Sequence, residues 1–204
     1  KSTLINLIPR YYDVTKGSVK VDGVDVRDMT QKELRDKLGY VPQKGVLFSG
    51  TIDSNIRYGK PEITDAQVKE AAEVAQATEF IDTKPEKYES PVSQGGTNVS
   101  GGQKQRLSIA RAIAKDPEIF IFDDSFSALD FKTDSQLRKA LKEYTKDATT
   151  VIVAQRISTI LGADQIIVLD DGHMAGIGTH KELMANCEVY QQIARSQLSE
   201  EELA

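Results

Sequence analysis

Three clusters of residues in this 204-residue chain carry groups suited to phosphate chemistry. The first is Lys1-Ser2-Thr3, which matches the end of the phosphate-loop pattern G-x-x-x-x-G-K-[ST]. In such a loop the lysine reaches the β- and γ-phosphates of a nucleotide, and the hydroxyl that follows binds Mg²⁺. The tripeptide alone is a weak signal, because the backbone N–H groups that cradle phosphate come from residues before the lysine. Its interpretation depends on the other two clusters.

The second cluster is Asp123-Asp124, directly after the apolar run Ile119–Phe122. Such a run is typical of a strand that is buried on both faces of a parallel sheet. Ligands of open α/β sheets bind at the carboxyl ends of strands, and a carboxylate at this place holds Mg²⁺ in phosphate-loop NTPases. A solvated strand end or a helix N-cap is the alternative interpretation.

The third cluster, Ser100-Gly101-Gly102-Gln103, begins a predicted helix with apolar residues at helical spacing. Glycine lets the backbone approach a phosphate closely. A helix N-terminus also presents free N–H groups and the positive end of the helix dipole. The cluster therefore indicates a second phosphate contact.

Alternating strands and helices must position these clusters. Two more apolar runs, Val151–Ala154 and Ile166–Leu169, are separated by polar helical stretches such as Asp134–Tyr144. This alternation predicts an α/β fold with a mostly parallel sheet and helices on both faces. Gln155 then lies at a strand end, as Asp123 does. The other predicted elements are a hairpin around Asp22-Gly23, a strand within residues 37–42 and a helix from Thr64 to Ala77.

Composition excludes several classes of protein. A net charge of −5 and a pI near 5.2 give no basic face for nucleic acid and no polybasic patch for anionic lipid. The single cysteine, Cys187, cannot form an internal disulfide and indicates a reducing compartment. No apolar run approaches the ~18 residues of a membrane helix. The length fits one domain, and the acidic tail, residues 199–202, is expected to be a solvated or frayed end.

The stretch Val99–Arg106, VSGGQKQR, resembles the signature motif of the ABC ATPases. In that family the motif reaches across a head-to-tail dimer and touches the γ-phosphate bound by the other subunit. The stretch Leu47–Ile52 is similar to the corresponding sequence in the exporter branch of the family. The resemblance to the ABC ATPases extends over residues 1–197. The other matching motifs are Gln43 of the Q-loop, Ile119–Asp124 of the Walker B strand, Ser127–Asp130 of the D-loop and Gly178–Leu183 near the C-terminus.

The resemblance implies one ATP-binding domain: a phosphate-loop NTPase (RecA-like) lobe, residues 1–51 and 117–204, and an inserted helical subdomain, residues 52–116, that carries the signature. ATP and Mg²⁺ are the implied ligands. The implied partners are a second cassette and the transmembrane domain of an exporter, at the cytoplasmic face of the cell membrane, and no nucleic acid.

The resemblance also implies a role for individual residues. The implied nucleotide contacts are Lys1, Ser2, Thr3, Gln43, Ser100, Gly101, Gly102, Gln103 and Asp130. The implied Mg²⁺ contacts are Ser2, Gln43 and Asp123, and the implied catalytic residues are Asp124, Gln155 and Gln43.

Four departures from the family pattern qualify these roles. The sequence begins at the phosphate-loop lysine, without the glycines and strands before it, so we expect this stretch alone to bind nucleotide poorly. Asp124 replaces the usual general-base glutamate, which puts its carboxylate ~1–1.5 Å further from the attacking water and can cost ~100-fold in rate. Gln155 replaces the switch histidine and cannot carry a proton. Ser93–Gly96 replaces a Glu-Arg-Gly type segment that senses the transmembrane domain.

Asp124 and Gln155 together resemble the degenerate subunit of heterodimeric ABC exporters. We expect such a subunit to bind ATP, to hydrolyse it slowly, and to complete its partner's site with Ser100–Gln103. A homodimer remains open. The alternatives are a nucleotide-gated regulatory clamp with negligible turnover, a soluble ABC ATPase of DNA repair or translation, and a fragment without activity of its own.

Overall fold

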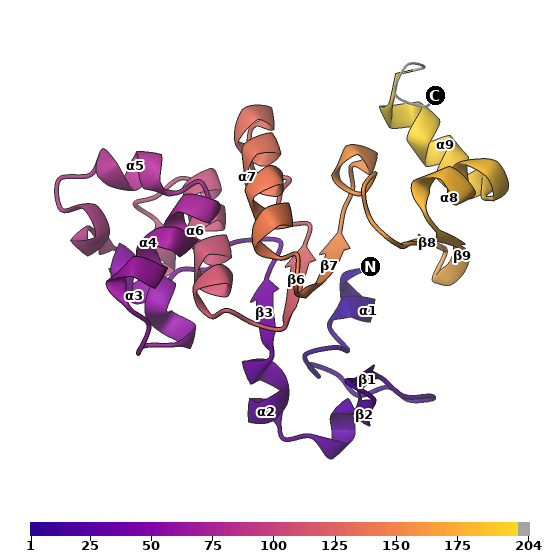
Figure 1. Ribbon diagram of the computed structural model, residues 1–204, viewed down its shortest axis with the longest axis horizontal. Helices are drawn as coiled ribbons and strands as arrows, with labels where there is room; N and C mark the ends of the chain where they lie inside the picture. Colours follow the sequence, from indigo (N-terminus) through magenta and orange to yellow (C-terminus); the bar gives the residue numbers. More distant parts are fainter. Residues whose placement is uncertain (200–204) are drawn as a thin grey trace. The chain divides into compact units, whose positions relative to one another are not determined.

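The computed structural model describes residues 1–199, which form two compact units. Ser2–Val153 form the larger unit, and Lys1 with the residues from Ala154 onward form the smaller one (Figure 1). Among the described residues, no helix combines the length and the apolar character needed to span a bilayer. Residues 200–202, predicted to be a solvated end, lie outside the described residues.

A three-stranded parallel sheet organises the larger unit. Its strands, in spatial order, are β3 (Leu38–Val41), β6 (Ile119–Asp123) and β7 (Thr149–Val153). Because β6 lies in the middle, Phe120, Ile121 and Phe122 are at most 1% exposed. This confirms the predicted buried strand. The strand predicted from Val151 is also confirmed, but Val151 and Ile152 are only half-buried, since among residues 1–199 β7 pairs with β6 alone.

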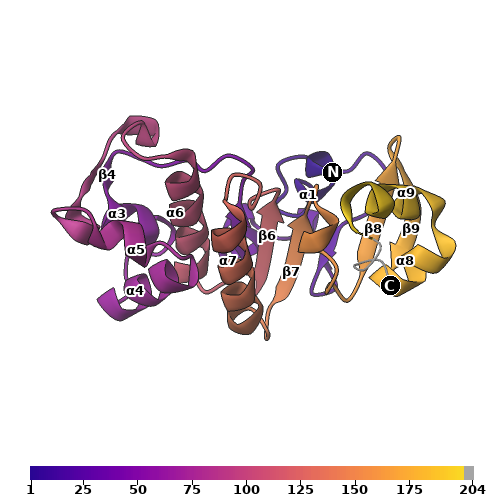
Figure 2. The same cartoon turned by 90° about the horizontal axis from the view of Figure 1, so that it is seen from above.

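Helices cover both faces of this sheet, as the α/β prediction requires. The helices that pack on the sheet are α1 (Ser2–Ile5), α2 (Gln31–Asp36), α6 (Gly101–Ala114) and α7 (Phe131–Tyr144). The other helices of the larger unit lie outside α6: α3 (Ile52–Ile56) and α4 (Asp65–Val74) pack on α6, and α5 (Thr78–Asp82) packs on α4. Alternate side chains of β6 enter two separate cores. Phe120 and Phe122 pack with residues of α6 and α7, while Ile121 packs with Ile5 of α1 and Leu34 of α2. Figure 2 shows α7 and α1 on opposite sides of the sheet.

Helices α3 to α6 all come from the segment between β3 and β6. The predicted helix starts at Thr64 and Ser100 are confirmed, and each of these residues is an N-cap in a reciprocal capping box with the third residue of its helix. α4 ends at Val74, before the predicted Ala77, because Gln76 has a φ of 56° and cannot continue the helix. The limits 52–116 of the helical subdomain stay a prediction. The segment also holds two short antiparallel strands, β4 (Gly50–Thr51) and β5 (Pro91–Val92), and 3₁₀ turns at Arg57–Gly59, Lys87–Glu89 and Gln94–Gly96.

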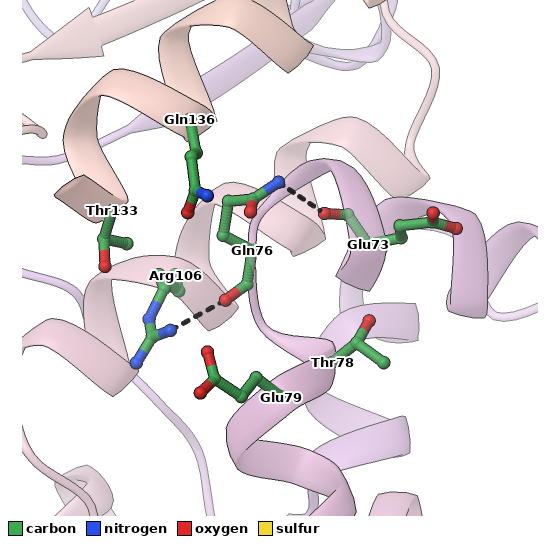
Figure 3. Close-up of a pocket in the computed structure, with 7 residues that line it drawn as sticks. All are labelled: Glu73, Gln76, Thr78, Glu79, Arg106, Thr133 and Gln136. Atoms are coloured by element: carbon green, nitrogen blue, oxygen red, sulfur yellow. Dashed lines mark hydrogen bonds between the residues drawn. The ribbon is translucent and has the colours of Figure 1, made fainter.

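A polar pocket of about 220 Å³ lies among α4, α5, α6 and α7 (Figure 3). Arg106 of α6 donates from Nη1 to the carbonyl of Gln76 at 2.7 Å, and its guanidinium lies 4.8 Å from the ring centroid of Phe80. Burial lowers the pKa of Arg106. These contacts attach α6 to the turn after α4. The lining residues, none of which is a predicted site residue, are Glu73, Gln76, Thr78, Glu79, Arg106, Thr133 and Gln136.

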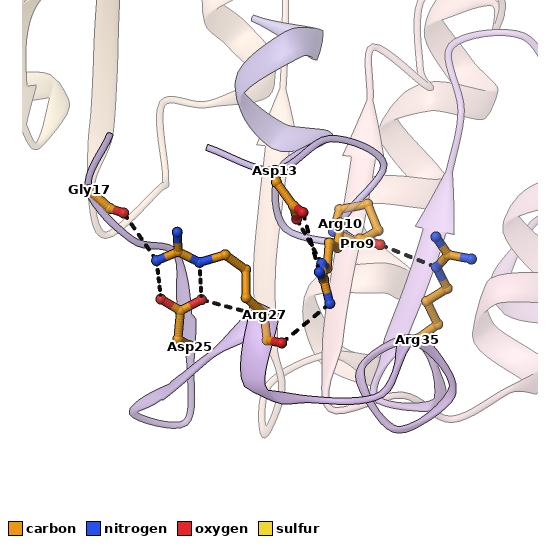
Figure 4. Close-up of polar contacts among 7 residues, drawn as sticks. All are labelled: Pro9, Arg10, Asp13, Gly17, Asp25, Arg27 and Arg35. Carbon is orange, nitrogen blue, oxygen red and sulfur yellow. Dashed lines mark hydrogen bonds and ion pairs between the residues drawn. The ribbon is translucent and has the colours of Figure 1, made fainter. Parts of the chain in front are cut away.

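Arginine side chains fix the long connection between α1 and α2 (Figure 4). Arg10 pairs with Asp13 at 2.7 Å, and Arg27 pairs with Asp25 at 2.7 Å while also donating to the carbonyl of Gly17. Hydrogen bonds from Arg27 lower the pKa of Asp25 to about 2. The connection that follows the start of the chain is thus held by ion pairs at its surface, and a 3₁₀ turn, Val26–Asp28, leads to α2.

Two hairpins turn on an Asp-Gly pair. The strands are β1 (Lys20–Val21) and β2 (Val24–Asp25) in the larger unit, and β8 (Ile166–Asp170) and β9 (His173–Gly178) in the smaller. In both loops φ is positive at both residues, 52° and 80° at Asp22-Gly23, and 43° and 80° at Asp171-Gly172. Positive φ at both positions is the type I′ geometry that matches strand twist. The first hairpin is confirmed.

The second hairpin corrects one prediction. The run Ile166–Leu169 was expected to add a strand to the parallel sheet, but among the described residues β8 pairs only with β9, and antiparallel. The reason is the Asp171-Gly172 turn, which returns the chain at once instead of leading it through a crossover helix. The smaller unit is completed by a 3₁₀ turn at Ile157–Thr159 and by α8 (His180–Asn186) and α9 (Glu188–Gln197). Cys187, buried at the junction of these two helices, belongs to the core of this unit.

Candidate functional site

The start of α1 and the end of β6 bring a hydroxyl to a carboxylate. Ser2 Oγ donates to Asp123 Oδ1 at 2.9 Å, and Asp123 is 6% exposed. Asp123 is the last residue of the central strand, so the sheet fixes its backbone. Two residues that lie 121 positions apart, both predicted to contact Mg²⁺, are therefore in direct contact. Thr3 lies beside them on α1, exposed.

A second pair of predicted residues meets next to the first. Gln43 Nε2 donates to Asp124 Oδ2 at 3.1 Å, and Asp124 is 7% exposed. The backbone of Asp124 has a φ of 49°, and its N–H donates to the carbonyl of Val153 on β7 at 2.9 Å. Asp is one of the few residues that adopts such a left-handed conformation at low cost. The turn after β6 thus holds this carboxylate at the edge of the sheet.

These side chains fit Mg²⁺ bound to a phosphate better than a cation bound by protein alone. Mg²⁺ prefers oxygen ligands and is usually held by one or two carboxylates together with substrate phosphates. Ser2 and Asp123 supply a hydroxyl and a carboxylate, and Gln43 has an amide oxygen besides the nitrogen that it gives to Asp124. Within residues 1–199, no group of three or more His, Cys, Asp or Glu is suited to hold a metal. Oxygens of phosphate and water would complete the coordination of such an ion.

The signature cluster forms the N-terminus of α6. Gln103 N–H donates to Ser100 Oγ at 3.2 Å, and Ser100 N–H donates to Gln103 Oε1 at 3.2 Å. Since Ser100 Oγ only accepts in this capping box, its own hydrogen is left to donate elsewhere. A Cβ on Gly101 would meet no atom within 4 Å, so the turn is open. A Cβ on Gly102 would lie 3.5 Å from the carbonyl of Ala128, which places the signature next to the predicted D-loop.

Asp130 ends the predicted D-loop and caps α7. Its Oδ1 accepts from Thr133 N–H at 3.0 Å and its Oδ2 from Thr133 Oγ1 at 2.7 Å. These hydrogen bonds lower the pKa of Asp130. The carboxylate is therefore ionised and fixed as a helix cap, a role that the sequence interpretation did not assign to it.

Lys1 and Gln155 belong to the smaller unit. There the Lys1 ammonium donates to the carbonyl of Ala154 at 3.1 Å, immediately before Gln155. The Gln155 side chain is exposed, and its carbonyl accepts from Gln197 Nε2 of α9 at 2.9 Å. The lysine predicted to contact phosphate and the residue at the switch position are thus sequence-distant neighbours within this unit.

Gln105 is a residue that sequence reasoning missed. Its side chain on α6 is 1% exposed; Oε1 accepts from Gly45 N–H at 2.9 Å, and Nε2 donates to the Pro42 carbonyl at 3.0 Å. The two bonds flank Gln43 on either side and hold this loop against α6. The approach is close: a Cβ on Gly45 would lie 2.8 Å from the carbonyl of Lys104. The pattern VSGGQKQR contains Gln105, but nothing local in the sequence pairs it with Pro42.

Replacement of Gln105 by Leu should lower the free energy of unfolding by about 2–4 kcal/mol, because two backbone groups lose their partner in a largely buried place. Urea denaturation measures this. Gln136→Leu, an exposed glutamine on α7, is the matched control and should stay within about 0.5 kcal/mol of the parent. Equal stability of the two variants would contradict the bracing role of Gln105.

Comparison with known proteins identifies the family. The family model described as ABC transporter matches residues 1–127. The chain belongs to the ABC transporter family. This confirms the ABC resemblance, the α/β fold and the assignment to an ATP-hydrolysing family.

Relatives and a solved structure agree with the family assignment. An uncharacterized ABC transporter ATP-binding protein of Mycobacterium tuberculosis is 48% identical over 200 residues, which are 97% of this chain and 34% of that protein. A Staphylococcus aureus protein, provisionally described as a multidrug export ATP-binding/permease protein, is 48% identical over 193 residues, 95% of this chain and 33% of its own length. The structure of a bacterial Atm1-family ABC exporter with ATP bound has a TM-score of 0.94 at 40% identity, and covers 98% of this chain and 35% of its own. The chain spans about a third of the length of these ABC proteins.

Proposed function

We propose that this chain is the ATP-binding domain of an ABC exporter, with a slow site of its own and an intact signature that completes the site of a partner cassette. The observation that carries the slow site is Asp124. This shorter carboxylate occupies the general-base position, and its Oδ2 already accepts a hydrogen bond from Gln43. A base that falls short of its water by about 1 Å loses ~100-fold in rate.

Five residues bind and orient the nucleotide in this proposal. Lys1 contacts the β- and γ-phosphates, with Thr3 beside it, and Ser2 and Asp123 hold Mg²⁺ through a hydroxyl and a carboxylate that already lie 2.9 Å apart. Gln43 offers its amide oxygen to the cation or to the attacking water. Mg²⁺, when bound, neutralises the charge that develops on the phosphate oxygens. Asp124 accepts the proton of the water, but weakly.

The signature serves the other site. Ser100 keeps its hydroxyl hydrogen for a γ-phosphate because its oxygen already caps α6, and the space beside Gly101 is open, since a Cβ there would meet no atom within 4 Å. Gln103 holds the serine in place through the capping box. Asp130 and its neighbours lie beside this turn and run along the proposed dimer interface.

The relatives support coupling to transport. The Staphylococcus aureus relative combines ATP binding with a permease, and the solved neighbour is an exporter. We propose that MgATP closes this cassette on a second, different one, and that closure drives a transmembrane domain from the cytoplasmic face of the membrane. Asp124 and Gln155 also favour a second candidate, a nucleotide-gated clamp with negligible turnover.

The test is ATP hydrolysis by the transporter reconstituted with its partner cassette. Ser100→Asp keeps a good N-cap for α6 but places a negative charge toward the phosphate, and should lower hydrolysis by about 100-fold. Asp124→Asn should change the rate of ATP hydrolysis little. Ser196→Asp, on the exposed side of α9, is the matched control for the added charge.

Each other outcome points elsewhere. A loss with Asp124→Asn as large as with Ser100→Asp means that this chain's own site is the active one, and the degenerate assignment is wrong. Negligible hydrolysis by the reconstituted parent transporter, with nucleotide binding intact, supports the clamp. Normal hydrolysis by the protein without any partner cassette contradicts the proposal of a slow site.

A further inference from the structure

The hydroxyl of Tyr40 lies between Asn6 and Asp123. Tyr40 is the third residue of β3, next to central strand β6, and its ring packs in the same core as Ile121. Its OH is 2.9 Å from Asn6 Oδ1 and 3.4 Å from Asp123 Oδ2. A tyrosine hydroxyl has one hydrogen to donate and can also accept a hydrogen bond.

Both carboxylate oxygens of Asp123 therefore face a hydroxyl. Ser2 donates to Oδ1 at 2.9 Å, and Tyr40 faces Oδ2 at 3.4 Å. The two donors differ in freedom. Ser2 Oγ turns with a single side-chain torsion, whereas the Tyr40 oxygen lies at the end of a packed ring on a sheet strand. A donor of the second kind fixes the plane of a carboxylate.

One hydrogen serves two acceptors here. A phenol has a single O–H, so Tyr40 donates either to Asn6 Oδ1 or to Asp123 Oδ2 at any moment. The shorter contact, to Asn6, is the stronger in this structure. Asn6 is also tied to the predicted phosphate segment, because its N–H donates to the Ser2 carbonyl at 3.0 Å. Asn6, Ser2 and Asp123 are thus linked in a chain of contacts, and the Tyr40 hydroxyl reaches both ends of it.

We infer that Tyr40 is a positioning residue, which orients the Asp123 carboxylate toward the cation, and that Asn6 competes with Asp123 for the Tyr40 proton. The inference rests on the proposed role of Asp123 in holding Mg²⁺. Such outer hydrogen bonds to a ligating carboxylate typically contribute 10–100-fold to metal affinity.

The readout is the affinity for ATP in Mg²⁺ divided by the affinity for ATP in EDTA. Both are measured by calorimetry on the full-length protein. Tyr40→Phe removes only the hydroxyl. It should lower the ratio about 10-fold while ATP binding in EDTA stays unchanged. Tyr11→Phe is the matched control: its ring lies edge-on to that of Tyr40 at 5.7 Å, and the side chain is half exposed. Its ratio should equal that of the parent.

Asn6→Leu separates positioning from packing. Removal of the competing acceptor leaves the Tyr40 proton to Asp123 alone, so the ratio should be at or above that of the parent. If Asn6→Leu lowers the affinity ratio as much as Tyr40→Phe does, then Tyr40 acts by anchoring α1 through Asn6, and the inference is overturned. Loss of ATP binding in EDTA by Tyr40→Phe would overturn it too, since the hydroxyl would then support the fold of the whole site.

Asp123→Asn distinguishes this inference from the proposal beneath it. If Asp123→Asn leaves the ratio unchanged, Asp123 does not hold the cation and the proposed function fails at this residue. If Asp123→Asn lowers the ratio and Tyr40→Phe does not, the role of Asp123 stands and only the role of Tyr40 is wrong.

Discussion

ATP hydrolysis at this chain's own site should rise about 100-fold when Asp124→Glu is combined with Gln155→His. Glutamate extends the carboxylate by one methylene toward the attacking water. Histidine at position 155 adds a group that can carry a proton near neutral pH. Each change restores the residue that the ABC family usually has at its position.

The measurement needs a background in which only this site turns over. Ser100→Asp in the same chain disables the proposed partner site, so the remaining hydrolysis reports on Asp124 alone. Asp124→Glu by itself should give part of the gain, and Asp124→Asn should remove the residual rate. A rate that the double variant leaves unchanged would show that the slow site does not depend on Asp124 and Gln155.

Stability has to be followed alongside rate. Asp124 has a φ of 49°, which Asp adopts more readily than Glu. Asp124→Glu is therefore expected to lower the free energy of unfolding by about 1 kcal/mol. A gain in hydrolysis despite this loss separates the chemical effect from any general stabilisation of the fold.

Asp123→Asn should weaken MgATP binding by at least about 10-fold, since even outer residues of metal sites contribute that much. ATP binding in EDTA should hold or improve slightly, because the change removes a negative charge beside the phosphates. Calorimetry with Mg²⁺ and with EDTA measures both. Asp134→Asn is the control: Asp134 is 2% exposed and pairs with Arg138 on α7, so its loss should affect stability but not Mg²⁺ dependence. Equal behaviour of the two variants contradicts a metal role for Asp123.

Local patterns predicted much of the fold. The sequence predicts features that depend on neighbours within a few residues. These are the Asp22-Gly23 turn, the helix starts at Thr64 and Ser100, and the buried strand that begins at Ile119. The sheet partner of Ile166–Leu169 was not predicted correctly. An apolar run has the same composition in a parallel and in an antiparallel pair, so only the Asp171-Gly172 turn indicates that this strand pairs with the antiparallel strand after it.

The candidate site was predictable only as a set of residues. Spacing and resemblance indicated Ser2, Gln43, Asp123 and Asp124, but the contacts among them join positions 81 to 121 residues apart. Such contacts leave no periodic signal. Gln105 lies inside a recognised motif, but nothing in the sequence indicates its hydrogen bonds to the loop around Gln43. Tertiary geometry alone brings these side chains together.

The order of the strands has a consequence for synthesis on the ribosome. β3 pairs with β6, and Leu38 lies opposite Ile119, about 80 residues later. At about 5–20 residues per second, β3 waits roughly 4 to 16 s for its partner. Meanwhile α3 and α4 can form from contacts close in sequence, which fold faster than long-range parallel pairing. During this interval the nascent chain carries β3 without its partner β6, beside a partly formed helical segment, and aggregation then competes with folding.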